Sequence, residues 1–139
     1  MRHFYSLNEF SSEQIGEFVN RALAFKENPY SEVLDHRQIA LLFLNQSLRT
    51  RCSFEVATRE LGGDVSTLDA ETLFALETEF GKRMDGASAE HVKEAIGVFS
   101  RYFSALGLRS FARGEDQQED LLDKTFTTFL EHAKIPVFN

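Results

Sequence analysis

The sequence predicts an α/β domain of three layers (α/β/α), in which the middle layer is a mainly parallel sheet of four strands. Residues 39–44 form an unbroken apolar run of strand length, as expected for a strand that is buried on both faces. Apolar segments with helical spacing alternate with short apolar runs along the chain, which is typical of a parallel sheet with crossover helices. The 139 residues, 42% of them hydrophobic, predict a single domain spanning 1–139.

The first predicted elements are a helix and the apolar strand. Ser11 and Gln14 fit a capping box, and apolar residues then recur at helical spacing. The breakers at 28–31 (Asn-Pro-Tyr-Ser) end this helix. A polar stretch follows, and the run at 39–44 is the first predicted strand.

A second helix and strand follow a polar break after the first strand. The helix is expected from about Thr50 to Leu61, and Gly62-Gly63 is a C-terminal stop signal. Residues 65–68 read as the second strand, and 73–83 fit either a helical turn or a loop. The residues expected to face inward from this helix are Phe54, Ala57 and Leu61.

The second half of the chain repeats the alternation. Ser88 is expected to cap a helix that runs through Phe103, and 106–108 begin the third strand, which ends near Arg109 and Ser110. An acidic turn at 115–116 precedes a further helix, and 135–138 form the fourth strand. The residues expected to face inward from that last helix are Leu122, Phe126, Phe129 and Leu130.

Charge and composition exclude several classes of protein. The net charge of −7 argues against nucleic-acid or anionic membrane partners, which require a basic face. The single cysteine, Cys52, excludes an internal disulfide and favours a reducing compartment; we expect it to be buried. Neither a signal peptide nor a run of about 20 apolar residues is visible, so we expect a cytoplasmic protein. The four histidines lack metal-ligand spacing, and no metal site is predicted; His91 is expected to be structural.

The segment that predicts a function is Ser47-Leu48-Arg49-Thr50-Arg51, at a strand-to-helix junction. Free backbone N–H groups and the helix dipole favour an anion at such a junction. Two hydroxyls and two guanidinium groups within five residues match the oxygens of a phosphate. The alternative is a pair of solvated surface arginines, but arginine is unfavourable at a helix N-terminus and an anion would resolve this conflict. The glycine-rich signature of a nucleotide P-loop is missing.

This segment, with Ser53-Phe54-Glu55 and Leu61-Gly62-Gly63 after it, resembles the signature of aspartate and ornithine carbamoyltransferases. Further stretches are similar to the branch of the family that carbamoylates N-acetylornithine or N-succinylornithine. They are 76–79 (Leu-Glu-Thr-Glu), 84–86 (Met-Asp-Gly), 90–91 (Glu-His), 107–111 (Gly-Leu-Arg-Ser-Phe) and 136–138 (Pro-Val-Phe). The resemblance covers nearly the whole chain but only the N-terminal half of the family's proteins.

The resemblance implies that Ser47, Leu48, Arg49, Thr50 and Arg51 bind the phosphate of carbamoyl phosphate. It also implies that Arg109, directly after the third strand, is catalytic and polarises the carbamoyl carbonyl. The acceptor would be the side-chain amine of N-succinylornithine, N-acetylornithine or ornithine, in arginine biosynthesis. No cofactor is implied, and the family's N-terminal half builds a homotrimer.

Two positions depart from the family's pattern. Phe74 stands where a neighbouring subunit lends a tryptophan to the phosphate site, and it lacks the indole donor, so a packing role is an equal alternative. Ala89 stands at a position that, by the resemblance, selects the acceptor. The family has glutamate there for the acetylated acceptor and proline for the succinylated one. Alanine has no charge to repel a succinyl carboxylate, which favours the succinylated acceptor.

Two family segments, His-Pro-x-Gln and His-Cys-Leu-Pro, are missing from the sequence, so we expect that the C-terminal amino-acid-binding domain is absent. The isolated chain should then bind carbamoyl phosphate weakly and turn over poorly. An alternative interpretation is a non-catalytic phosphate-binding or trimer-assembly module of the same fold. A third is a phosphate-binding α/β domain without carbamoyl chemistry.

Overall fold

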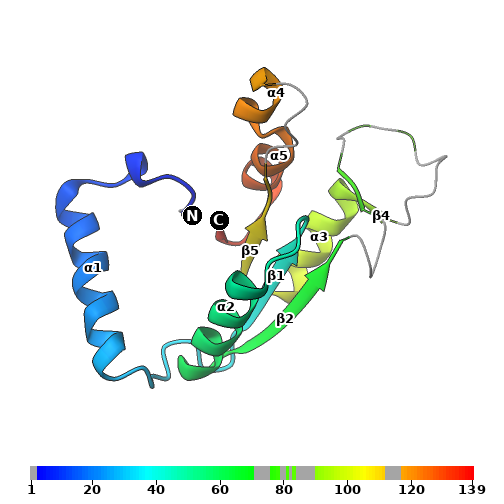
Figure 1. Cartoon of the computed structure of the whole chain (residues 1–139). Coiled ribbons are helices and arrows are strands. Elements are labelled where there is room, and N and C mark those ends of the chain that lie inside the picture. Colours follow the sequence, from blue (N-terminus) through cyan, green and yellow to red (C-terminus); the bar gives the residue numbers. More distant parts are fainter. Residues whose placement is uncertain (1–2, 71–75, 79–80, 82, 84–89, 112–116) are drawn as a thin grey trace.

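Four parallel strands form the central sheet in the order β2-β1-β5-β6 (Figure 1). The structure is a computed structural model of the chain and describes residues 3–70, 76–78, 81, 83, 90–111 and 117–139. The strands are β1 (Gln38–Phe43), β2 (Asp64–Asp69), β5 (Ala105–Arg109) and β6 (Val137–Phe138). The predicted fold class, a mainly parallel four-stranded sheet between helices, is confirmed.

The central strand β1 explains the apolar run in the sequence, because both of its faces are buried. Ala40 and Leu42 point to one face and Ile39, Leu41 and Phe43 to the other, and none of the five is more than 6% exposed. Such a strand has no solvent side, so it needs no alternation of polar and apolar residues.

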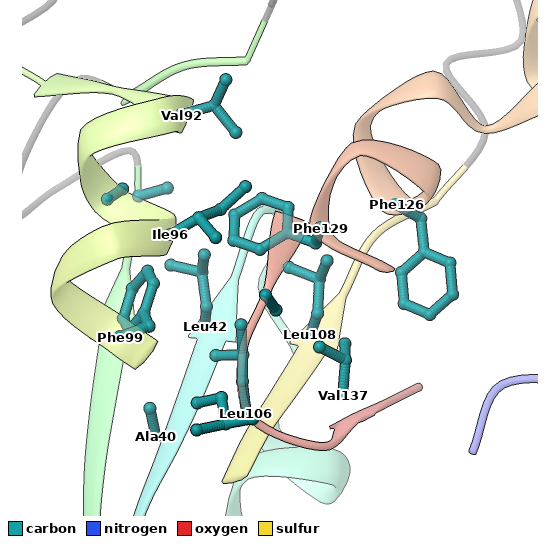
Figure 2. Close-up of a cluster of buried hydrophobic side chains, with 14 residues drawn as sticks. Ala40, Leu42, Val92, Ile96, Phe99, Leu106, Leu108, Phe126, Phe129 and Val137 are labelled. Atoms are coloured by element: carbon teal, nitrogen blue, oxygen red, sulfur yellow. The ribbon is translucent and has the colours of Figure 1, made fainter. Parts of the chain in front are cut away.

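The larger core lies between the sheet and two helices, α3 (Val92–Tyr102) and α5 (Lys124–His132). Figure 2 shows Leu42, Leu106 and Leu108 from the sheet meeting aromatic and aliphatic side chains from these helices. The opposite face is covered by α2 (Leu48–Glu60), whose Phe54 ring lies 5.3 Å from that of Phe138. The three layers are therefore α3 and α5, the sheet, and α2.

Helix α1 (Ser12–Glu27) begins at the predicted capping box: Ser11 and Gln14 exchange side-chain to backbone hydrogen bonds of 3.3 and 3.0 Å. None of its residues is buried, and the helix stands apart from the sheet in Figure 1. Phe18 contacts Phe4 and Phe10, which flank the short 3-10 helix η1 (Leu7–Glu9). Phe4 also pairs with Phe138, so the N-terminal segment extends the sheet beyond β6.

Helix α2 ends as predicted but faces the sheet differently. Gly62 has a φ of +84°, and an added Cβ would lie 3.1 Å from the carbonyl oxygen of Ser31. Ala57, which was expected to face inward, is exposed, and Thr58 is the buried residue of this helix. Thr58 can be buried because its hydroxyl donates a 2.8 Å hydrogen bond to the carbonyl oxygen of Phe54.

The last helical region is split where a single helix was expected. Asp123, with a φ of 35°, separates α4 (Gln117–Leu122) from α5 and caps α5 through a hydrogen bond from the Phe126 N–H. The break takes Leu122 off the inward face of α5, so Leu122 is 62% exposed and its predicted burial is wrong. Phe126 and Phe129 are buried as predicted.

Helix α3 starts later than expected. His91 caps it, with Nδ1 accepting a 3.1 Å hydrogen bond from the Lys93 N–H, whereas the expected cap, Ser88, lies outside the described residues. His91 also belongs to β4 (Glu90–His91), which pairs with β3 (Leu76–Glu77). In the described ranges, no helix has the length and apolar character needed to cross a membrane.

We predict that Gly107→Ala destabilises the domain. A Cβ at this position in β5 would lie 2.6 Å from Phe138 and 2.7 Å from Leu41, and Leu41 is only 2% exposed. Overpacking of this kind costs roughly 1–3 kcal/mol of unfolding free energy, measured by denaturant titration.

The matched control is Gly97→Ala in α3, where nothing lies within 4 Å of the added Cβ. This substitution should stabilise the helix by up to about 1 kcal/mol, because alanine is the better helix former. Equal unfolding midpoints for the two variants would contradict the packing described for Gly107.

Candidate functional site: the carboxyl ends of β1 and β5

The candidate site lies where the order of the strands in the sheet reverses, between β1 and β5. β1 pairs with β2 on one side and with β5 on the other. The chain leaves β1 for α2 on one face, and after β5 it reaches α5 on the opposite face (Figure 1). The loops after β1 and β5 therefore diverge, and such a divergence is where open parallel sheets bind ligands.

Three polar side chains meet at this point. Ser47 is the N-cap of α2, and its hydroxyl accepts a 3.4 Å hydrogen bond from the Thr50 N–H and donates a 3.0 Å one to Thr50 Oγ1. Arg109, the last residue of β5, donates from Nη1 to the same Thr50 Oγ1 at 3.1 Å. A guanidinium group is thereby fixed beside the first turn of α2, whose N–H groups and dipole favour an anion.

Arg109 is held from several sides. Its guanidinium carbon lies 4.2 Å from the centre of the Phe111 ring, and its carbonyl oxygen accepts a 3.0 Å hydrogen bond from the Leu44 N–H. Within the described part of the chain, the buried Arg109 Nε has no hydrogen-bond partner. A buried donor that lacks a partner costs about 1–3 kcal/mol, and an anionic or carbonyl oxygen would satisfy it.

A pocket of about 190 Å³ opens beside Thr50 and Arg109. Its walls are mainly apolar, and Asn139 adds a third polar side chain to those of Thr50 and Arg109. Such a lining suits a small polar ligand held in a fixed orientation. The other lining residues are Leu41, Leu42, Phe43, Phe54, Gly107, Leu108 and Phe138.

Comparison with known proteins shows which family the chain is related to. Residues 2–139 match the family described as aspartate/ornithine carbamoyltransferase, carbamoyl-P binding domain. The chain belongs to this family.

Two curated carbamoyltransferases illustrate the relationship. The N-acetylornithine carbamoyltransferase of Xanthomonas campestris is 32% identical over 140 residues, covering 100% of this chain and 41% of the relative. The N-succinylornithine carbamoyltransferase of Bacteroides fragilis is 40% identical over 111 residues, covering 79% of this chain and 35% of the relative. The domain thus spans about two fifths or less of these relatives.

A solved structure agrees in fold. It is a glutamate-to-alanine mutant of N-acetyl-L-ornithine transcarbamylase, complexed with carbamyl phosphate and N-succinyl-L-norvaline. This carbamoyltransferase matches the present domain with a TM-score of 0.94 at 33% identity, over 100% of this chain and 42% of that one.

All but one of the predicted site residues fall into three groups. Ser47, Thr50 and Arg109 converge, as described above. Leu48 and Arg49 lie in the first turn of α2 with exposed side chains. Phe74 and Ala89 lie outside the described residues.

Arg51, the remaining predicted site residue, is hydrogen-bonded to Glu55, for which the sequence predicted no role. Its Nε donates a 3.0 Å hydrogen bond to Glu55 Oε1, which also accepts a 2.5 Å one from Thr67 Oγ1. Glu55 thereby ties α2 to β2. The spacing of Arg51 and Glu55, four residues apart on a helix, is the signal that would have revealed the pair.

Hydrogen bonding stabilises the ionised form of Glu55. The bond from Thr67 contributes most to lowering its pKa, burial acts in the opposite direction, and Arg51 and Arg59 lower the pKa further. The side chain is 22% exposed. The first turns of α2 therefore carry an internal charge pair, in addition to the polar groups that face β5.

Two further expectations have clear outcomes. Cys52 is exposed, so its predicted burial is wrong, because it lies on the side of α2 that faces away from the sheet. His91 is structural, as predicted, since it caps α3. Throughout the described ranges, three or more His, Cys, Asp or Glu residues nowhere gather as a metal site would require.

We predict that Glu55→Gln flattens the acid limb of the stability profile. Because the folded-state pKa of Glu55 is lowered, its ionised form contributes stability above the unfolded value of about 4.3. That contribution is lost as the pH falls through the lowered folded-state pKa. Unfolding free energies measured between pH 3 and 7 should differ by roughly 1 kcal/mol at neutral pH and converge in acid.

The control is Glu17→Gln on the exposed face of α1, which should leave the profile unchanged. A constant offset between wild type and Glu55→Gln across the whole pH range would show that the ionisation of Glu55 is not what stabilises the domain.

Proposed function

We propose that this chain binds carbamoyl phosphate at the carboxyl ends of β1 and β5, as the carbamoyl-phosphate-binding part of a carbamoyltransferase. The observation that carries this proposal is the meeting of Arg109 Nη1 with Thr50 Oγ1 at the first turn of α2, next to an Arg109 Nε without a partner in the described ranges. The phosphate would lie at the N-terminus of α2, against the backbone N–H groups of its first turn and the Ser47 and Thr50 hydroxyls. Arg49 would add positive charge at the rim.

The proposed chemistry needs orientation and electrostatics rather than a covalent intermediate. The acceptor amine attacks the carbamoyl carbon, the bond from that carbon to the phosphate oxygen breaks, phosphate leaves, and the amine loses a proton. Arg109 would stabilise the negative charge that develops on the carbonyl oxygen during attack. A preorganised donor of this kind contributes about 2.7–4 kcal/mol to transition-state stabilisation.

We further propose an N-acylornithine as the acceptor, bound mainly by a C-terminal amino-acid-binding domain outside this chain. The relatives support this proposal by their names and by their greater length. Ala89 favours the succinylated acceptor, and a transcarbamylase mutant with alanine in place of a glutamate was solved with N-succinyl-L-norvaline. We also propose a homotrimer, with Phe74 contributed to a neighbouring site.

Calorimetric titration of the chain with carbamoyl phosphate tests the proposal. Wild type should show saturable binding, and Arg109→Ala should weaken it about 10- to 100-fold, the range for hydrogen bonds to charged groups. Thr50→Val keeps the side-chain shape while removing the hydroxyl, and it should weaken binding through the loss of the Arg109 contact.

Arg101→Ala is the matched control, because Arg101 is an exposed arginine in the last turn of α3. It should bind as wild type does. A folded wild-type chain that binds no carbamoyl phosphate would overturn the proposal and leave the trimer-assembly interpretation.

A further inference from the structure

The aromatic ring of Phe111 lies against the guanidinium group of Arg109. The Arg109 guanidinium carbon lies 4.2 Å from the centre of the Phe111 ring, within the range of a cation–π contact. Phe111 is 57% exposed, so burial in the core does not account for its position. The ring lies against the guanidinium, while the polar contact of Arg109 to Thr50 is made by Nη1.

The backbone around Phe111 is fixed from two other elements. The Phe111 N–H donates a 2.9 Å hydrogen bond to Oδ1 of Asn45, in the loop after β1. The preceding residue, Ser110, makes a longer contact of 3.5 Å from its hydroxyl to Oδ1 of Asp123, the N-cap of α5. Asn45 and Asp123 therefore fix residues 110–111, which carry the aromatic ring.

A ring in this position orients Arg109 without using any of its donors. Guanidinium N–H groups point outward in the plane of the group, and an aromatic ring attracts the face of that plane. Thr50 fixes one donor and Phe111 limits rotation of the plane, which leaves Nε as a buried donor without a partner in the described part of the chain. Arg109 then reaches a ligand oxygen with less loss of side-chain entropy.

We propose that Phe111, anchored through Asn45, is a positioning residue that gives the site its preference for carbamoyl phosphate over inorganic phosphate. The inference rests on the proposed function. The phosphate part of the ligand would be bound mainly by the first turn of α2, which Phe111 reaches only through Arg109 in the described contacts. The carbonyl oxygen is the part that depends on the direction of Arg109. Loss of the ring should therefore weaken binding of the carbamoyl group selectively.

The experiment compares the dissociation constants of carbamoyl phosphate and inorganic phosphate for the full chain, by calorimetry. Phe111→Leu keeps an apolar side chain but removes the ring, and it should weaken carbamoyl phosphate binding roughly 3- to 30-fold. Its affinity for inorganic phosphate should stay within about twofold of wild type. Phe111→Tyr restores an aromatic face and should restore the preference.

Asn45→Ala tests the anchor. It should reduce the same preference, and the double variant with Phe111→Leu should lose no more than Phe111→Leu alone, because Asn45 acts through the ring. Tyr102→Leu removes another exposed aromatic residue, 71% exposed at the end of α3, and should bind both ligands as wild type does. Circular dichroism confirms that each variant is folded.

Each outcome separates the inference from the proposed function. If wild type prefers carbamoyl phosphate and Phe111→Leu keeps that preference, or loses affinity for both ligands equally, the positioning role is overturned and the proposed function stands. If wild type binds both ligands equally well, the inference is overturned and the proposed function stands. If a folded wild type binds no carbamoyl phosphate, the proposed function fails and the inference fails with it.

Discussion

The parallel pairing of β1 with β5 is the interaction on which the rest of the structure depends. It brings residue 43 beside Arg109 although 66 positions separate them along the chain. The helices that follow β1 and β5 lie on opposite faces of the sheet, so the loops after these two strands diverge at their carboxyl ends. The pairing is stabilised by burial of β1 on both sides, so the position of the polar groups at the edge is set by the apolar packing behind it.

The site combines a rigid frame with a small number of polar contacts. Leu42, Leu106 and Leu108 are at most 1% exposed, and together with α3 and α5 they fix the strand that ends at Arg109. On the other face, Glu55 and Thr67 tie α2 to β2 and so fix the helix that begins at Ser47. The Thr50 to Arg109 hydrogen bond joins these two parts. The positions of the polar groups at the carboxyl ends of the strands therefore depend on the helices of both layers.

Much of this arrangement can be predicted from the sequence, because the relevant signals are local. The apolar run of β1, the Ser11 capping box and Gly62 each specify their element through residues a few positions apart. The segment from Ser47 to Arg51, which begins α2, is also recognisable, since its arginines conflict with a plain helix start. Leu122 and Ala57 were misplaced because a left-handed residue at Asp123 and the burial of Thr58 alter the faces of two helices. The contacts of Phe111 with Asn45 and Arg109 depend on strand order, which local patterns do not encode.

The most direct test of the proposed site is a crystal structure of the chain with carbamoyl phosphate bound. We expect the phosphate against the first turn of α2, with Ser47 and Thr50 in contact and the Arg109 guanidinium directed at the carbonyl oxygen while it remains against the Phe111 ring. Carbamoyl phosphate bound elsewhere on the domain, or bound at this edge with Arg109 turned away from it, would contradict the proposed site.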